Sequence, residues 1–496
     1  MSLVKKLISV ILTAVIIVSA VPFAASAQSS TGRIYPFISE VDDYFGELKD
    51  YIAEGLRARK KTMDITDFNI SQDDIIYVIR SVMFDNPDIF YVDSAYIPYK
   101  YEKETGRVAT ITPQYIFKRS KIPSYIKKFN SASKKLIKGI DSSWSDYKKA
   151  LVIHDRIAAN CRYYSKGLKS YTAYNIIVAH KGLCEGYSRA YCHLLSLVGV
   201  DSKTINNEAQ GHCWNMVKLG GYWYHVDVTA DDPMPDTCGY VRHKFFLLTD
   251  SGLRSADDGI HNGYKSDITY DSDYICNSSK YNGYFFRNIT SQIVYINGSF
   301  YYMNNKYNGK YNSALIKRNG SKKVLKVIKD VWKNSYGNSM NKSPCKLFEY
   351  NGKIYFNTKR KIIRYNPETG GFKRIFNMPS FINGDLVGVT CQGTSAYVSK
   401  ANANHTKYSK VKLMKFYSKS KPTVLPFLKY TKKTVSKKSS FKLKVYYGSG
   451  KITYKSSNSK IARVSSKGRV KTLKKGSCTI TAVRNNTKLK CKIKVV

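Results

Sequence analysis

Residues 211–229 read GHCWNMVKLGGYWYHVDVT, and this stretch decides the fold of the region around it. Two apolar-rich runs of alternating character flank Gly220 and Gly221, a pattern typical of a β-hairpin closed by a tight primed turn. In such a hairpin, residues equally far from the turn lie opposite each other and share a face. His212 and Asp227 then become diagonal neighbours on one face, with Cα atoms about 7–8 Å apart. We therefore expect an even-length loop to bring this imidazole and carboxylate together, whereas an odd-length loop would separate them.

A cysteine upstream of the hairpin is the candidate partner for this pair. Residues 171–200, YTAYNIIVAHKGLCEGYSRAYCHLLSLVGV, predict a short helix, a Lys-Gly break and a longer helix. Cys184 lies at the start of the longer helix, where unpaired backbone N–H groups and the helix dipole favour a thiolate. A neighbouring His212 would lower the thiol pKa further, and Asp227 would hold the imidazole in the required tautomer. The backbone N–H of Cys184 could also face an oxyanion.

Each of these residue types also has an ordinary structural role. A helix cysteine is usually a small buried hydrophobe, and a strand histidine usually makes a structural hydrogen bond. His225 lies in the same hairpin as His212 and is the alternative candidate for the base. Asp227 could instead form a structural hydrogen bond with a loop. We interpret three other cysteines as structural: Cys161, Cys192 and Cys238. A helix-start cysteine together with a histidine and an aspartate on one face is much rarer by chance than any member alone.

Three blocks of sequence, in this order, resemble the transglutaminase-like superfamily. They are HDRIAANCRYY, then YTAYN with KGLCEGYSRAY, and then GHCWNMVKLGGYWYHVDVTADDP, within residues 146–270. The resemblance implies a papain-like α+β fold in which the cysteine helix packs against an antiparallel sheet. It also implies that Cys184 is the nucleophile, His212 the base and Asp227 the orienting carboxylate, which favours His212 over His225.

Neighbouring segments add to this resemblance and also depart from it. HKFFLLTDSGLRS, from His243, resembles the segment that follows the triad in the family, and residues 34–144 are similar to the region that precedes it in secreted bacterial relatives. Ala230 stands where similar bacterial sequences often have Trp, which leaves the substrate wall near Asp227 open. Tyr174 is the candidate side-chain donor to the oxyanion.

The N-terminus predicts export. Lys5 and Lys6 precede an apolar run over residues 7–20, and Ala-Ser-Ala at 25–27 forms a small-residue cleavage site. This is the pattern of a secretory signal peptide, whereas an N-terminal membrane anchor would need a longer apolar run. We expect a mature chain that begins near Gln28 and is secreted, without a transmembrane segment after signal removal.

The chain is strongly basic, with a formal net charge of +47, and its acidic residues end at Asp385. A charge run is usually a solvated face, yet a domain without carboxylates has a long-range positive field that attracts polyanions. For an exported protein these are anionic cell-wall or surface polymers. No base-reading motif favours specific nucleic-acid binding.

The 496 residues predict several domains. We expect a signal peptide over 1–27, a mainly helical region over 28–145, the transglutaminase-like domain over 146–271, a β-rich repeat module over 272–420 and a β-sandwich over 421–496. Within the mainly helical region over 28–145, residues 71–87 predict a helix capped by Ser71, and residues 90–102 alternate like a strand.

The two C-terminal modules have different signatures. In the β-rich module, strand–turn–strand units recur at the spacing of propeller blades, so it is either propeller-like or a simple sheet repeat. ITYKSSNSKIARVSSKGRVKTLKKGSCTITAV, over 452–483, resembles the bacterial immunoglobulin-like repeat of group 2, which implies a spacer or adhesion module. Cys478 and Cys491 flank the predicted turn there, and a disulfide or two unpaired buried thiols are equally compatible with this position.

Two functions from different classes remain open. The first is a secreted or cell-surface cysteine enzyme that attacks peptide or carboxamide bonds through a thioester. An amine acceptor would make it a protein crosslinker, and water would make it a peptidase or amidase. The second is a catalytically inert surface adhesion or binding protein that uses its β-rich modules. Neither reading requires a metal or an organic cofactor.

Overall fold

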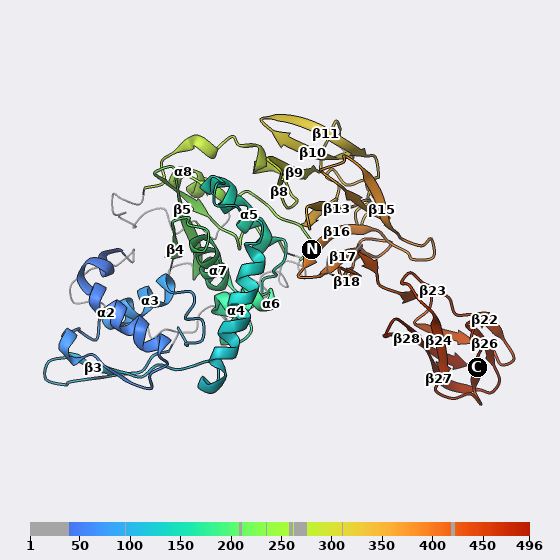
Figure 1. The fold of residues 1–496 in the computed structure, drawn as a ribbon, viewed down its shortest axis with the longest axis horizontal. Helices are drawn as coiled ribbons and strands as arrows, with labels where there is room; N and C mark the ends of the chain where they lie inside the picture. The colour runs from blue at the N-terminus through green and yellow to red at the C-terminus, as the bar shows by residue number, and fades with distance from the viewer. Residues whose placement is uncertain are drawn as a thin grey trace, which may run out of the picture. The chain divides into compact units, whose positions relative to one another are not determined.

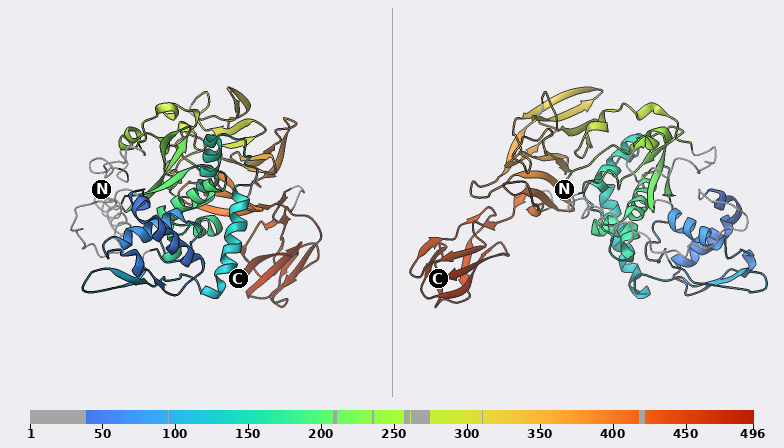
Figure 2. Two further views of the ribbon diagram at one scale, coloured as in Figure 1. Left: turned by 60° about the vertical axis from the view of Figure 1, so that its left-hand side comes forward. Right: turned by 180° about the vertical axis from the view of Figure 1, so that it is seen from behind.

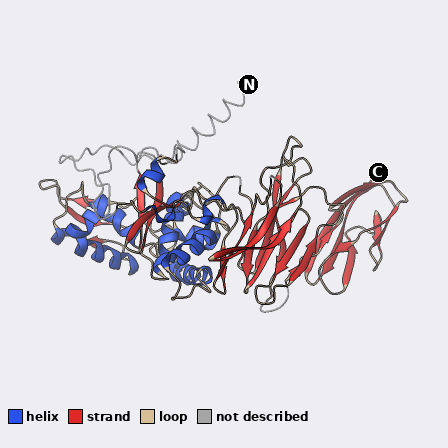
Figure 3. Cartoon of the chain, turned by 90° about the horizontal axis from the view of Figure 1, so that it is seen from above, coloured by secondary structure: helices blue, strands red, loops and turns tan. Residues whose placement is uncertain are grey.

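The computed structural model describes residues 39–496 apart from 95, 208–210, 235, 257–260, 262–274, 310 and 418–421. The predicted signal peptide lies outside the described residues, as do the predicted boundaries at 271 and 420. The chain forms two compact units, one of residues up to 236 with 240–295 and the other of 237–239 with 296–496. Among the described residues, every α-helix belongs to the first unit, and the second unit is built from strands (Figure 3).

The N-terminal region is mainly helical, with one small sheet. Its helices are α2 (Ser39–Arg57), α3 (Ile75–Asp85) and α4 (Ile122–Leu136), joined by short 3-10 turns at Thr66–Phe68 and Arg119–Lys121. Its three-stranded antiparallel sheet has the order β1-β3-β2, formed by β1 (Met63–Asp64), β2 (Tyr99–Tyr101) and β3 (Val108–Ile111).

Two predictions for this region need adjustment. Helix α3 begins at Ile75, because Ser71 and Asp74 close a turn ahead of it, in which the Ser71 hydroxyl donates to the Asp74 carboxylate at 2.6 Å. Within the described part of the stretch predicted as a strand over 90–102, a strand forms only as β2, after Pro98, which has no backbone N–H to offer a sheet, and Val92 makes an isolated bridge with Tyr115.

The central part of the first unit is a mixed α/β core. Its helices are α5 (Asp146–Ala158), α6 (Ala173–Ala179), α7 (Cys184–Ser196) and α8 (Asp250–Arg254), with 3-10 turns at Leu168–Tyr171, Ser279–Tyr281 and Phe285–Asn288. Its antiparallel sheet has the order β4-β5-β6-β7, formed by β4 (Ser202–Asn207), β5 (His212–Leu219), β6 (Tyr222–Val226) and β7 (Phe246–Leu248).

The β5–β6 hairpin has the register that the sequence predicts. Leu219 lies opposite Tyr222, and the two glycines between them have positive φ angles of 59° and 87°. A two-residue primed turn requires this backbone conformation, which glycine adopts without steric cost. Helix α7 packs beside this sheet (Figure 1), and the Asn215 amide donates to the Ser188 carbonyl of α7 at 3.0 Å.

Two glycines allow a neighbouring turn to pack tightly against the start of α7. A Cβ atom at Gly182 would lie 2.7 Å from the Ser170 carbonyl oxygen, and one at Gly186 would lie 2.8 Å from the same atom. The Leu183 N–H donates to that carbonyl at 2.9 Å. The Gly-x-Cys-x-Gly spacing therefore lets one backbone oxygen fix the position at which the helix begins.

The second unit opens with three successive four-stranded antiparallel sheets. The first sheet contains β8 (Val294–Ile296), β9 (Ser299–Asn304), β10 (Ser313–Asn319) and β11 (Ser321–Ile328). The second sheet contains β12 (Leu347–Tyr350), β13 (Lys353–Asn357), β14 (Lys361–Tyr365) and β15 (Phe372–Asn377). The third sheet contains β16 (Leu386–Gln392), β17 (Ser395–Ala401), β18 (Tyr408–Lys415) and β19 (Thr423–Val424). These sheets form a repeat, but within the described ranges they form no closed barrel. A propeller-like closure is thus not confirmed, since three sheets are fewer than the four or more blades that closure needs.

The C-terminal part is a small β-sandwich, seen from two further sides in Figure 2. One sheet has the order β21-β28-β27-β24, a second has β22-β26-β25, and a two-stranded ribbon pairs β20 with β23. The strands are β20 (Phe427–Leu428), β21 (Lys432–Val435), β22 (Ser440–Lys442), β23 (Val445–Tyr446), β24 (Ile452–Ser456), β25 (Ala462–Val464), β26 (Arg469–Thr472), β27 (Gly476–Arg484) and β28 (Thr487–Val495). One apolar core joins the two larger sheets, since it contains Val470 together with Ile480 and Ile493.

The disulfide considered between Cys478 and Cys491 is not formed. In the β27–β28 register Cys478 lies opposite Ile493, and Cys491 lies opposite Ile480. The two cysteines are therefore diagonal rather than directly opposed, and both are free, buried thiols within the sandwich core.

Candidate active site

The structure places Cys184 as the first residue of α7. Leu183 precedes it in an extended conformation, and no side chain caps the helix. The N–H groups of the first turn therefore remain available to an anion, and the helix dipole favours negative charge at this point. Cys184 is 8% exposed, and its Sγ lies 4.0 Å from the Gly211 carbonyl oxygen, directly ahead of β5.

His212 and Asp227 meet at one end of the β5–β6 hairpin. His212 is the first residue of β5, Asp227 follows the last residue of β6, and His212 Nε2 lies 2.6 Å from Asp227 Oδ2. Because Asp227 engages Nε2, the other ring nitrogen of His212 is left for Cys184. Asp227 Oδ1 accepts from the Ala230 N–H at 2.9 Å, so both carboxylate oxygens are held.

Cys184, His212 and Asp227 shift one another's pKa values. A hydrogen bond from Cys213, together with His212, lowers the pKa of Cys184 well below its ordinary value, against the effect of burial. Burial disfavours a charged His212, but Asp227 and Cys184 outweigh it and raise its pKa to about 10. Burial also opposes the Asp227 carboxylate, yet His212 and His261 hold its pKa below the usual range. The favoured state is a thiolate–imidazolium pair supported by a carboxylate.

A second histidine, His261, contacts the same carboxylate. Its Nε2 lies 3.0 Å from Asp227 Oδ2, and its ring packs edge-on against His212 with centroids 5.4 Å apart. No sequence pattern points to His261, because it follows Asp227 by 34 residues in a segment without periodicity. Only the three-dimensional arrangement reveals that Asp227 is shared.

His225, the competing base, has different partners. Its Nδ1 accepts from the Trp214 indole N–H at 3.1 Å, and its Nε2 pairs with Asp250 at 2.8 Å. Both ring nitrogens are thus engaged within the core of the sheet, so the structure brings His212, and not His225, to Asp227.

Tyr174 lies in an aromatic cluster, whereas Tyr163 pairs with the segment just ahead of Cys184. The Tyr174 ring stacks on Phe90 with centroids 4.9 Å apart, inside an aromatic cluster that the α4 helix helps to form. Burial raises the pKa of Tyr163, and the negative charge of Cys184 raises it further. Tyr163 bridges to Gly182, ahead of Cys184, a pairing of distant segments that no local pattern predicts.

The three cysteines predicted to be structural are all buried. Cys192 Sγ lies 3.5 Å from the Thr204 hydroxyl and 3.1 Å from the Asn215 amide nitrogen. Cys161 donates to the Ile176 carbonyl at 3.6 Å. Cys238 is also buried, among residues of the second unit.

Three buried clusters in the described part of the chain have donor atoms suited to a metal ion: His154 with Asp155 and His243, His212 with Asp227 and His261, and His225 with Asp250 and Cys276. The donor set of histidine and carboxylate suits zinc or a related ion. In the second cluster, a bound cation would occupy the candidate base itself. The third is linked internally, because Asp250 pairs with His225 and also accepts from the Cys276 N–H at 3.0 Å.

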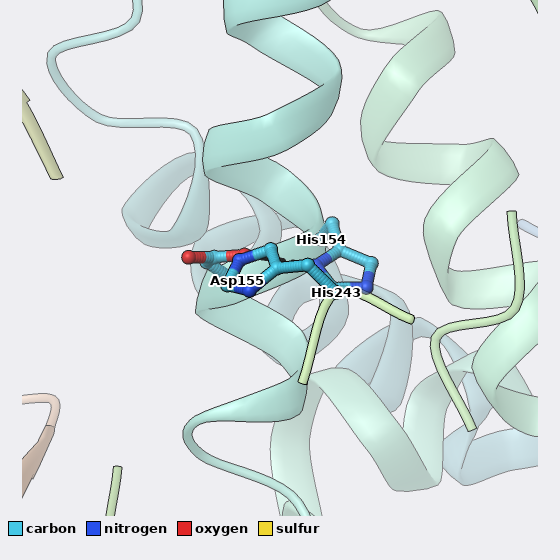
Figure 4. Close-up of side chains that lie close together, drawn as sticks. All are labelled: His154, Asp155 and His243. Carbon is cyan, nitrogen blue, oxygen red and sulfur yellow. Dashed lines mark hydrogen bonds and ion pairs between the residues drawn. The ribbon is translucent and has the colours of Figure 1, made fainter. Parts of the chain in front are cut away.

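The first cluster, which Figure 4 shows, is linked internally through Asp155. His154 Nδ1 and His243 Nε2 lie 2.8 Å and 3.0 Å from the same oxygen of Asp155. His154 Nε2 also lies 3.3 Å from Asp231. Burial opposes a charge on His154, but the two carboxylates outweigh it and raise its pKa to about 9. The contacts of His243 with Asp155 and of His154 with Asp231 tie α5 to the segment between β6 and β7.

Comparison with known families agrees with the geometry. Residues 134–228 match the model of the transglutaminase-like superfamily, and residues 428–495 match the bacterial Ig-like domain of group 2. The chain contains a transglutaminase-like domain. The match includes Cys184, His212 and Asp227 but ends before His261, so this second histidine lies beyond the part that the family model describes.

Solved structures share only parts of this chain. An intimin mutant from EHEC O157:H7 is 32% identical over 12% of this chain and 34% of its own, with a TM-score of 0.12. A TGase is 11% identical over 28% of this chain and 45% of its own, with a TM-score of 0.19. The S-layer protein SbsC, domains 4 and 5, is 15% identical over 39% of this chain and 93% of its own, with a TM-score of 0.14. The chain thus spans less than half of the first two proteins, and a comparison with curated proteins returned no match.

Proposed function

We propose that the transglutaminase-like domain is a cysteine acyl-transfer enzyme in which Cys184 is the nucleophile, His212 the base and Asp227 the residue that orients it. The observation that carries this proposal is the 2.6 Å contact between His212 and Asp227 beside a cysteine at a helix start. A buried histidine–aspartate pair with a purely structural role would need no cysteine beside it. The lowered pKa of Cys184 supplies the nucleophile that acyl transfer requires.

The reaction follows from these positions. The Cys184 thiolate attacks the carbonyl carbon of a carboxamide or peptide bond, and the oxyanion lies near the free N–H groups of the α7 start. The His212 imidazolium gives its proton to the leaving amine, which departs and leaves a thioester on Cys184. An amine or a water molecule then attacks the thioester while His212 takes the proton, and the thiolate is restored.

We assign the side-chain contribution to the oxyanion to Tyr163 in place of Tyr174. Tyr163 pairs with Gly182, two residues before Cys184, and a phenol keeps its proton at neutral pH, so Tyr163 can donate a hydrogen bond there. Substitution by phenylalanine preserves the ring and removes only the donor. We expect Tyr163→Phe to lower the acyl-transfer rate by about 10- to 100-fold, while Tyr174→Phe should change it by less than about threefold.

Product analysis tests the reaction. The mature chain is incubated with a glutamine-containing peptide, with and without a primary amine, and the products are identified by mass spectrometry. Amine incorporation would identify a crosslinker, and release of the free acid or of a shorter peptide would identify a hydrolase. Failure of the wild-type protein to exceed the Cys184→Ala variant with a panel of carboxamides and peptides would refute the enzymatic role.

The alternative is an inert surface-binding protein, favoured by the sheet repeat and the Ig-like domain. A thiol-reactive amide probe separates the two roles, because an inert domain has no reason to activate one thiol. Under the enzymatic role, Cys184 is labelled much faster than Cys192. Equal labelling of the two cysteines would favour the binding role.

We also propose that the protein is exported and that the Ig-like domain retains it at an anionic surface. On the outer face of the β21-β28-β27-β24 sheet, lysines recur at alternate positions of β28, namely Lys488, Lys490, Lys492 and Lys494, all exposed. Lys432 lies beside Lys492 in the register, which widens this stripe of positive charge. Of the described helices, none is long and apolar enough to span a membrane. Moderate salt should release the protein from isolated cell walls, and binding that ignores ionic strength would contradict retention by charge.

A further inference from the structure

Cys213 follows the candidate base in β5 and faces the helix that carries the candidate nucleophile. Side chains along a strand alternate between its two faces, so Cys213 and Asn215 point to the same side. The Asn215 amide donates to Ser188 O in α7 at 3.0 Å, which identifies that side as the helix face. Ser188 lies one helical turn after Cys184, since its hydroxyl donates to the Cys184 carbonyl at 3.0 Å. Cys213 therefore faces the start of α7.

Cys184 Sγ lies 4.0 Å from the carbonyl oxygen of Gly211, two residues before Cys213, so the helix start and this end of β5 lie close together. A side-chain hydrogen bond with Cys213 is the first cause of the lowered pKa of Cys184. A hydrogen bond with the Cys184 side chain raises the pKa of Cys213, and burial raises it further. Cys213 therefore keeps its proton while Cys184 is the thiolate. One sulfur is thus a nucleophile, and the other is a proton-bearing neighbour.

We propose that Cys184 and Cys213 form a reversible oxidation site, in which Cys213 is the resolving thiol that converts oxidised Cys184 into an intramolecular disulfide. The oxidant is a hydroperoxide, and the reductant is a dithiol. This proposal rests on the nucleophilic Cys184 of the proposed function, but it concerns how that sulfur is protected and switched off, not how it turns over substrate.

The chemistry balances in two steps. The Cys184 thiolate attacks one oxygen of the hydroperoxide, the O–O bond breaks, and the products are a Cys184 sulfenic acid and an alkoxide or hydroxide. The Cys213 sulfur then attacks the Cys184 sulfur, the S–O bond breaks, and the Cys213 proton leaves with the hydroxyl group as water. The two thiols lose two electrons in total, the peroxide gains them, and a dithiol reverses the change by exchange.

Local structure favours this pairing over the other nearby cysteine. A disulfide has a sulfur–sulfur bond of about 2.05 Å, so the two sulfurs of the reduced protein must move closer to form it. Cys184 is the first residue of α7 and Cys213 is the second of β5, at element ends where small shifts are tolerated. Cys192 lies two turns further along α7, where Thr204 and Asn215 hold its sulfur.

The test uses the full mature chain and hydrogen peroxide. Reduced protein is treated with a few equivalents of peroxide, free thiols are blocked with N-ethylmaleimide, and peptides are mapped without reduction. We expect one crosslinked peptide that joins Cys184 to Cys213 and disappears after dithiothreitol. In Cys213→Ser the crosslink should be lost, and Cys184 should proceed to sulfinic and sulfonic acids that dithiothreitol does not reverse. Cys213→Ala serves as a second variant without a hydroxyl.

The matched control is Cys192→Ser, which removes the other α7 thiol and should leave the crosslink unchanged. Wild-type protein in which Cys184 is oxidised without any link to Cys213 would overturn the proposal. So would a crosslink from Cys184 to Cys192. Amide turnover is measured separately on the reduced protein, so a crosslink without turnover refutes only the enzymatic role, and turnover without a crosslink refutes only the oxidation site.

Discussion

The two halves of α7 carry the same residue type in opposite electrostatic states. Cys184, at the start of the helix, has its pKa lowered by Cys213 and His212. Cys192, two turns later and also facing β5, has its pKa raised, chiefly by burial, although Thr204 and Asn215 hydrogen-bond it. Membership of α7 alone therefore does not set the pKa of a thiol. A hydrogen bond with Cys213 and an adjacent imidazole lower the pKa of Cys184, whereas burial prevails at Cys192.

The largest expected effect comes from removing one cysteine or the other. Cys184→Ala should lower acyl-transfer turnover by at least about 10³-fold, because the covalent intermediate can no longer form. Cys192→Ala should retain turnover within about threefold and lose about 1–2 kcal/mol of stability through a small cavity. Steady-state kinetics and thermal unfolding separate the two outcomes. An equal loss of turnover in both variants would contradict the assignment of different roles to Cys184 and Cys192.

The next effect distinguishes the two histidines of the hairpin. His212→Ala should lower turnover by about 10²- to 10⁴-fold, since general acid–base catalysis is lost. His225→Ala should instead destabilise the fold by about 1–3 kcal/mol, because it leaves the Trp214 indole and Asp250 without their buried partner. Alkylation of Cys184 in folded protein is the readout. Slow alkylation in His225→Ala with normal alkylation in His212→Ala would reverse the assignment.

Part of the candidate site could be predicted from the sequence, and part of it could not. Two adjacent glycines predict the turn, the turn fixes the register, and the register puts His212 and Asp227 on one face. His261 and Tyr163 reach the site from segments without periodicity, through tertiary packing alone. The sheet repeat was predicted from its spacing, but closure depends on contacts between sheets, which no local pattern encodes.

The pH dependence of alkylation sharpens the comparison. A lowered pKa keeps Cys184 a thiolate until the pH falls through that depressed value, and the pKa of about 10 keeps His212 protonated until the pH rises through it. Between these limits the alkylation rate of Cys184 with iodoacetamide should change by less than about threefold. An ordinary thiol gains roughly tenfold per pH unit below its pKa. A tenfold rise per unit for Cys184 between pH 6 and 8 would show that it is not activated.

The smallest effect tests what fixes the helix start. Gly186→Ala should lower the free energy of unfolding by about 1–3 kcal/mol, because the new Cβ would lie 2.8 Å from the Ser170 carbonyl oxygen. Gly283→Ala is the matched control, since a Cβ there meets nothing within 4 Å, and it should be nearly neutral. Thermal denaturation measures both. If Gly186→Ala were as stable as Gly283→Ala, the close packing at Ser170 would not position Cys184.

The most direct measurement is the intact mass of the enzyme trapped during turnover. The protein is mixed with a glutamine-containing peptide, quenched in acid within seconds, and its mass is compared with that of Cys184→Ala. We predict a peptide adduct minus ammonia or the leaving amine, bound at residue 184 and released by hydroxylamine, and no adduct in the variant. Peptide turnover by wild-type protein without any hydroxylamine-sensitive adduct at Cys184, or an adduct that persists in Cys184→Ala, would contradict the account.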